Sequence, residues 1–93
     1  MSETTPIRYR IHPDAAWQQS ANEIFVVTAD NRLHNLRDEV SVALWAALEP
    51  DATLEGLVDT IVQDFEVSPD VARQDTRDFL EDAEERALIQ RVP

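Results

Sequence analysis

The period of the hydrophobic pattern changes once along this chain, close to residue 38. Before this point, short runs of β-branched and aromatic residues favour strands. After it, apolar residues recur at three- and four-residue spacing, which is typical of amphipathic helices. Strands that all precede the helices indicate an α+β fold, in which a small antiparallel sheet packs on a helical cluster.

Three strands are expected before the change of period. The first spans 15–21, and the second, 23–28, is rich in strong β-formers. Asp30 and Asn31 tolerate positive φ and suit a hairpin turn into the third strand, 32–36. The third strand is short, polar and last in the meander, and these are properties of an edge strand.

Three helices are expected after the change. The first follows Asp38 and stops before Pro50, and the second begins with Thr53 as its N-cap. The third begins with Ser68 as N-cap and Pro69 at its first helical position. This last helix is long, and its polar face is almost entirely charged.

A chain of 93 residues has room for one domain with a single core. Residues 1–14 hold two prolines and show no clear period, so we expect a flexible N-terminal arm there. Residues 15–93 then form the domain. The start of the sequence lacks an apolar signal segment, and no apolar run approaches the length of a membrane span, which predicts a cytoplasmic protein.

The chain is strongly acidic, with a formal net charge of -11. Most of it lies in residues 41–93, where four arginines stand against thirteen acidic residues. This field repels phosphate backbones and anionic lipids and favours basic or neutral partners. The alternative is that a small protein only keeps its charge away from zero for solubility.

Groups for catalysis or metal binding are sparse. The chain has no cysteine, and His12 and His34 are its two imidazoles. Four acids lie close together in the last helix and are expected to be a solvated face: Glu81, Asp82, Glu84 and Glu85. The sequence has no glycine-rich phosphate loop and no nucleophile elbow. We therefore expect no cofactor, no metal and no enzymatic activity.

Four features follow one another in a fixed order between residues 31 and 90. They are a strand ending in His34-Asn35-Leu36, a helix with Leu44-Trp45, a break followed by Thr53 and "LEGLVDTIVQDFEV", and a last helix with Asp75, Phe79 and Leu80 ending at Leu88-Ile89. In this order and spacing, over about two thirds of the chain, they resemble the PqqD-like family. This family is also described as the recognition element of enzymes that modify ribosomally made peptides.

The sequence departs from the family pattern at three positions and by one extra residue between Leu36 and Trp45. Arg37 stands where the family usually has an Asn helix cap, and we expect Asp38 to take over the cap. Ala83 replaces a larger apolar residue, and Ala87 replaces a Gly.

The resemblance implies a winged-helix-like fold, with a three-stranded antiparallel sheet packed on three α-helices. It also implies a non-catalytic function in natural product biosynthesis. Such a domain binds the leader segment of a precursor peptide and presents the core segment to a modifying enzyme, such as a radical-SAM maturase, a cyclase or a leader peptidase. In the family, the leader adds as a strand to the third strand, in a groove bounded by the last helix. We expect a monomer or a weak homodimer.

The expected peptide-binding residues lie on the third strand and the last helix: Asn31, Arg32, Leu33, His34, Asn35, Leu36, Ala72, Thr76, Phe79, Leu80 and Ala83. Small residues on the helix would leave a shallow groove beside the strand. Alternatively, they only let helix and sheet pack closely. For Arg32 and His34, the alternative to a peptide contact is that their charges only discourage edge-to-edge aggregation.

Two other functions remain open at this point. One is a structural or scaffold subunit of a larger enzyme complex. The other is a DNA-binding winged helix, against which the acidic field argues, because few arginines accompany many acids in the last helix. A basic or amphipathic leader suits that helix, whose acids would speed the encounter: Asp75, Asp78, Glu81, Asp82 and Glu85.

Overall fold

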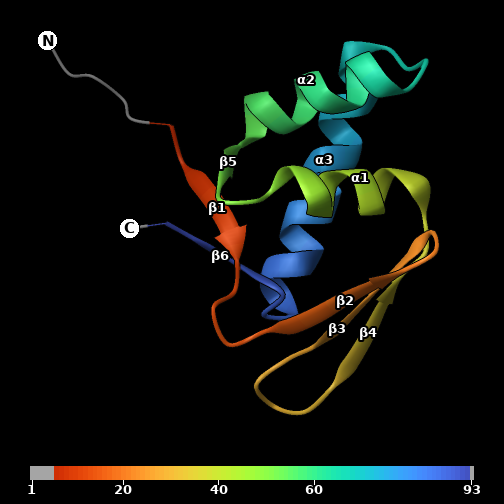
Figure 1. Ribbon diagram of the computed structural model, residues 1–93. Helices are drawn as coiled ribbons and strands as arrows, with labels where there is room; N and C mark the ends of the chain where they lie inside the picture. Colours follow the sequence, from red (N-terminus) through yellow and green to blue (C-terminus); the bar gives the residue numbers. More distant parts are fainter. Residues whose placement is uncertain (1–5, 93) are drawn as a thin grey trace, which may run out of the picture.

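The computed structural model describes residues 6–92, which form three helices and two antiparallel sheets (Figure 1). The elements are β1 (Arg8–Ile11), β2 (Ala16–Ser20), β3 (Glu23–Val27), β4 (Leu33–Leu36), α1 (Glu39–Ala47), β5 (Ala52–Thr53), α2 (Leu54–Asp64), α3 (Pro69–Glu85) and β6 (Ile89–Arg91). The α+β architecture, with three helices and a three-stranded antiparallel sheet, is confirmed.

The expected sheet is the meander β2-β3-β4. Its register pairs Val27 with Leu33 and Ile24 with Leu36 between β3 and β4. Asn31 adopts a φ of 66° in the turn before β4, as its tolerance of positive φ predicts. The meander leaves both β2 and β4 as edge strands among the described residues, because each pairs only with β3.

A second sheet, in the order β5-β1-β6, was not expected from the sequence. It includes Arg8–Ile11, a segment that the sequence placed in a flexible arm; residues 1–5 of that arm lie outside the described residues. Tyr9 is buried, and the Arg91 guanidinium lies over its ring at 5.7 Å from the centroid. Its partner strands, β5 and β6, are very short and distant in sequence from β1, so no local sequence pattern predicts this pairing.

The helices begin where the sequence predicts. Asp38, Thr53 and Ser68 each accept a hydrogen bond from the backbone N–H three residues further on, at 2.9, 3.1 and 3.3 Å. Pro69 occupies the first turn of α3, where its missing N–H costs nothing. Asp38 thus caps α1, as expected from the sequence.

The end of α3 differs from the expected one at Leu88-Ile89. The helix ends at Glu85, and Ala87 then adopts a φ of 59°. The Leu88 N–H donates to the Ala83 carbonyl at 2.9 Å, which is the bond of a Schellman turn. This turn buries Leu88 and sends the chain back into β6.

The core lies between the inner face of the β2-β3-β4 sheet and the three helices (Figure 1). Its large, fully buried side chains come from β3, α1, α2 and the C-terminal segment: Ile24, Val26, Leu44, Trp45, Leu48, Leu57, Ile61, Leu88 and Ile89. Residues from every layer meet in one cluster, so the helices supply most of the surface that covers the sheet.

Candidate functional site

The outer edge of β4 carries main-chain groups that no described strand uses. The Thr28 N–H donates to the Arg32 carbonyl at 3.0 Å, which sets the phase of the antiparallel ladder. By alternation, His34 and Leu36 bond to β3, while the N–H and C=O of Leu33 and Asn35 face away from it. These groups form a template for one more strand.

Side chains on β4 alternate between two faces. His34 and Leu36 are half-buried on the inner face, and Leu33 and Asn35 are exposed on the outer face. Leu33 is 66% exposed. A strand added beside β4 would alternate in the same way and send every second side chain toward the inner face.

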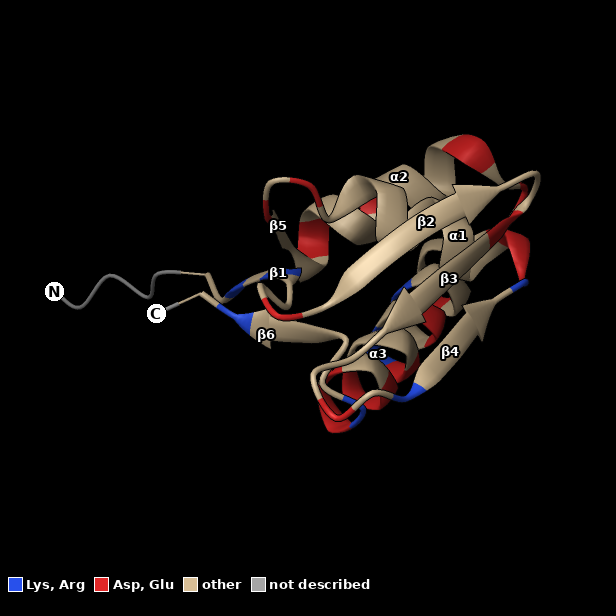
Figure 2. Ribbon diagram, turned by 60° about the horizontal axis from the view of Figure 1, so that its bottom comes forward, with Lys and Arg blue, Asp and Glu red and all other residues tan. Residues whose placement is uncertain are grey.

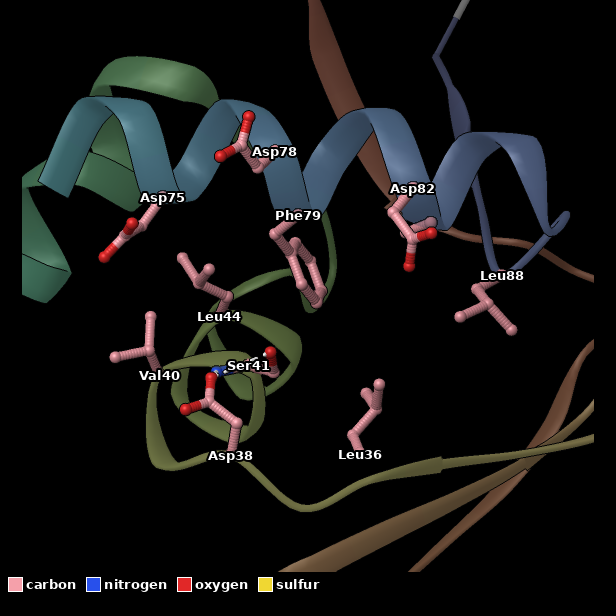
Figure 3. Close-up of a pocket in the computed structure, with 11 residues that line it drawn as sticks. Leu36, Asp38, Val40, Ser41, Leu44, Asp75, Asp78, Phe79, Asp82 and Leu88 are labelled. Carbon is pink, nitrogen blue, oxygen red and sulfur yellow. Dashed lines mark hydrogen bonds between the residues drawn. The ribbon is translucent and has the colours of Figure 1, made fainter. Parts of the chain in front are cut away.

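A hollow of about 400 Å³ lies on this inner side, between β4, the start of α1 and α3 (Figure 3). Its floor is apolar: Leu36, Val40, Leu44, Phe79, Ala83 and Leu88. Its rim is acidic: Asp38, Asp75, Asp78 and Asp82. Figure 3 shows Asp75, Asp78 and Asp82 along α3, with Asp38 on the opposite side at the start of α1.

A second hollow of about 380 Å³ follows β4 toward its start. Arg32 and His34 line it from the strand side, and Glu85 and Arg86 from the end of α3. Asp82 borders both hollows, so the two adjoin along β4. We call the two hollows together the β4–α3 groove.

The charges of the two hollows differ. In the second hollow, arginines accompany the acids, with Arg32 paired to Asp30 at 3.2 Å and Arg86 to Asp82 at 3.1 Å. The Thr28 hydroxyl, which hydrogen-bonds to Asp30, and the charge of Arg32 hold the pKa of the Asp30 carboxyl below its usual value. The first hollow has no arginine in its lining. Figure 2 shows acidic segments along α3, behind β3 and β4.

The sequence profile of the family described as Coenzyme PQQ synthesis protein D (PqqD) matches residues 31–89. The chain belongs to the PqqD family. The matched range includes β4 and α3, so both walls of the groove lie within the part that defines membership of the PqqD family.

The fold is similar to a solved structure titled "TbiB1 in Complex with the TbiA(beta) Leader Peptide". The TM-score is 0.81 at 23% sequence identity, over 87% of this chain and 94% of that one. This likeness extends beyond the range of the PqqD profile. A search of the curated proteins gave no match.

Most of the expected strand residues border the groove of this PqqD-family chain. Leu36 lines the first hollow, and Arg32 and His34 line the second. Leu33 and Asn35 contribute outward main-chain groups, as the ladder phase requires. Asn31 lies in the turn before the strand.

The expected helix residues divide between two faces of α3. Phe79 and Ala83 line the first hollow. Ala72 and Thr76 are fully buried in the core, where the Thr76 hydroxyl donates to the Ala72 carbonyl at 2.7 Å. Leu80 is buried as well, and it borders a separate hollow on another side of α3.

Several groove residues were not among the expected contacts. The rim acids Asp75, Asp78 and Asp82 were expected to affect the rate of encounter more than the final affinity, and Asp38 was expected as a helix cap. The acids on α3 share a face because three- and four-residue steps return to the same side of a helix. The spacing of these acids was the one feature of the sequence that could have placed them together at the groove. It was not decisive, because the core residues of α3 have the same spacing.

Metal-ligating clusters and membrane-spanning helices are both absent from the part of the chain that the structure describes. Within residues 6–92, no group of three or more His, Cys, Asp or Glu side chains is placed to hold a metal ion. In the same range, no helix combines the length and apolar character that crossing a membrane requires.

Proposed function

We propose that this protein binds the leader segment of a ribosomally made precursor peptide by strand addition to β4. The observation that carries the proposal is the unused edge of β4, with the outward main-chain groups of Leu33 and Asn35, directly beside the β4–α3 groove. Membership of the PqqD family supports it. The similarity of fold to TbiB1, whose structure holds a leader peptide, supports it further.

In the proposed complex, the leader extends the β2-β3-β4 sheet by one strand. Its main chain exchanges hydrogen bonds with Leu33 and Asn35, and these bonds supply affinity for any extended segment. Its inward side chains enter the groove beside Leu36 and His34, and the shape and charge of the groove supply selectivity.

The proposed role is non-catalytic. The groove would hold the leader while the core segment, which continues from it, reaches the active site of a separate enzyme. This role requires a partner enzyme that acts on a ribosomal product in the cytoplasm, such as a maturase, a cyclase or a leader peptidase.

A backbone-amide NMR titration tests the proposal. The titrants are leader peptides synthesised from short open reading frames next to the gene. We expect saturable shifts confined to β4, to residues 38–44 at the start of α1 and to residues 75–87, because these segments line the groove. Shifts that map elsewhere, or an absence of shifts with every neighbouring peptide, would overturn the proposal.

A further inference from the structure

We propose that the groove selects a cationic ligand, in which a bulky apolar side chain and a Lys or Arg side chain lie two positions apart in an extended segment. This inference rests on the proposed strand addition and names the class of peptide that the groove accepts. It follows from the ladder phase of β4 and from the contents of the first hollow.

The ladder phase decides which ligand residues enter the groove. Ligand residues bonded to Leu33 and Asn35 direct their side chains toward the outer face. The ligand residue opposite Leu36 therefore points inward, over the apolar floor that Leu44 and Phe79 help to form. A bulky apolar side chain at this position would occupy part of the hollow of about 400 Å³ and bury its surface against this floor.

The next inward position lies two residues further along the ligand, toward the start of α1. A step of two residues in an extended strand covers about 6.6 Å. At that end the hollow is bordered by the carboxylates of Asp38 and Asp75, with Asp78 beside Asp75 on α3 (Figure 3). A side chain that reaches this place meets acids from two sides.

Three of these rim carboxylates, those of Asp38, Asp75 and Asp78, are not held in ion pairs with any of the described residues. Asp38 accepts hydrogen bonds from Ser41 as a helix cap, and Asp78 accepts one from the Gln74 amide. A ligand strand that covers these carboxylates removes water from negative charges, which is unfavourable unless the ligand supplies a positive one.

The preference for a positive charge applies to one end of the groove only, because the second hollow, at the start of β4, already contains arginines. There, two of the acids already have a basic partner, since Arg32 pairs with Asp30 and Arg86 with Asp82. Glu81 does not contribute to the preference for a positive ligand side chain, because it borders a hollow on another side of α3. The basic ligand residue is thus expected on the α1 side of the apolar anchor, and not at a random place along the segment.

Selection from a random peptide library tests the proposed preference for a cationic ligand without the need for a known ligand. The probe is a library of peptides of about twelve residues, long enough to cover the groove at about 3.3 Å per residue. The full chain serves as bait, and NMR shifts at β4 identify the selected peptides that bind the groove. Among these, we expect enrichment of Lys or Arg two positions from a bulky apolar residue.

The outcomes separate the two proposals. Groove-binding peptides that are neutral or acidic would overturn the charge preference and leave strand addition intact. A selection that yields no peptide, or only peptides that shift residues elsewhere, would overturn both. Groove-binding peptides with the cationic pattern support both.

A variant pair then assigns the effect to the rim acids. We expect Asp75→Asn with Asp78→Asn to weaken binding of a selected Lys-containing peptide by about threefold to tenfold. Binding of the same peptide with Gln in place of Lys should change less than about twofold. The matched control, Asp59→Asn with Glu81→Gln, removes the same charge outside the groove. Equal losses in the two variants, or with the two peptides, would overturn the assignment.

Discussion

Trp17 on β2 stands edge-on to Trp45 on α1, with ring centroids 5.8 Å apart and an interplanar angle of 78°. Trp45 is fully buried, whereas Trp17 is 37% exposed at the edge of the sheet. The contact joins the meander that carries β4 to the helical core. The pair is thus one of the contacts that hold the meander on the helices, beside the buried Ile24 and Val26 of β3.

We expect Trp17→Ala to lower the free energy of unfolding by about 2 kcal/mol, because it removes one ring of an aromatic pair and exposes part of the core. Gln18→Ala, one residue further on and on the outer face, should change it by less than about 0.5 kcal/mol. Chemical denaturation of both variants measures this difference. Similar values for the two variants would contradict a structural role for the ring pair.

The open edge of β4 can be blocked without removing a side chain from the groove. Leu33→Pro deletes the outward N–H and should weaken leader binding by about 1 kcal/mol or more, roughly fivefold in Kd. Leu33→Ala keeps that N–H and should bind nearly as well as the unchanged protein. Titration calorimetry with one leader peptide measures both affinities.

A proline on the other edge of the sheet is the control for strand damage. By the same ladder phase, the N–H of Gln19 on β2 also faces away from β3. Gln19→Pro should therefore leave leader binding unchanged. If it weakens binding as much as Leu33→Pro does, the loss reflects general disruption of the meander and not a blocked edge.

The turn after α3 holds an alanine in a conformation that suits glycine. Ala87 has a φ of 59°, so Ala87→Gly should raise the free energy of unfolding by about 1 kcal/mol. Ala46→Gly makes the same chemical change at an exposed position inside α1, where it should lower that energy by about 1 kcal/mol. Opposite signs in thermal unfolding are the expected result, and equal signs would contradict the turn geometry.

An ion pair between α2 and α3 should make stability depend on pH. Arg73 donates two hydrogen bonds to Glu55, at 2.5 and 2.8 Å, and this contact lowers the pKa of Glu55 below its ordinary value of 4.5. A lowered pKa in the folded state adds stability above the unfolded pKa. That stability is lost as the pH falls through the folded value.

Thermal unfolding of the unchanged protein and of Glu55→Gln should therefore differ most at neutral pH. The difference should shrink as the pH falls below about 4. Glu66→Gln is the control, because Glu66 is exposed and forms no ion pair among residues 6–92. A difference that stays constant at all pH values would show that the contact does not depend on the carboxylate charge.

Features that depend on residues close together in the chain could be predicted before the structure was known. The change of hydrophobic period gave the order of strands and helices, because burial on one face of an element imposes its own repeat. Asp38, Thr53 and Ser68 were recognisable as caps because each bonds a backbone N–H only three residues away. The third strand was recognisable as an edge strand because its short length and polar residues are properties of the segment itself.

The face of α3 that borders the groove could not be predicted from the sequence, because it depends on how the helix packs against the sheet. The stripe of Ala72 and Thr76 and the stripe of Asp75 and Phe79 share one helical period, so periodicity alone cannot tell which one meets the core. The β1–β6 pairing was likewise invisible, since it joins the two ends of the described chain. In both cases the partner is distant in sequence, and the contact exists because the whole core has closed around it.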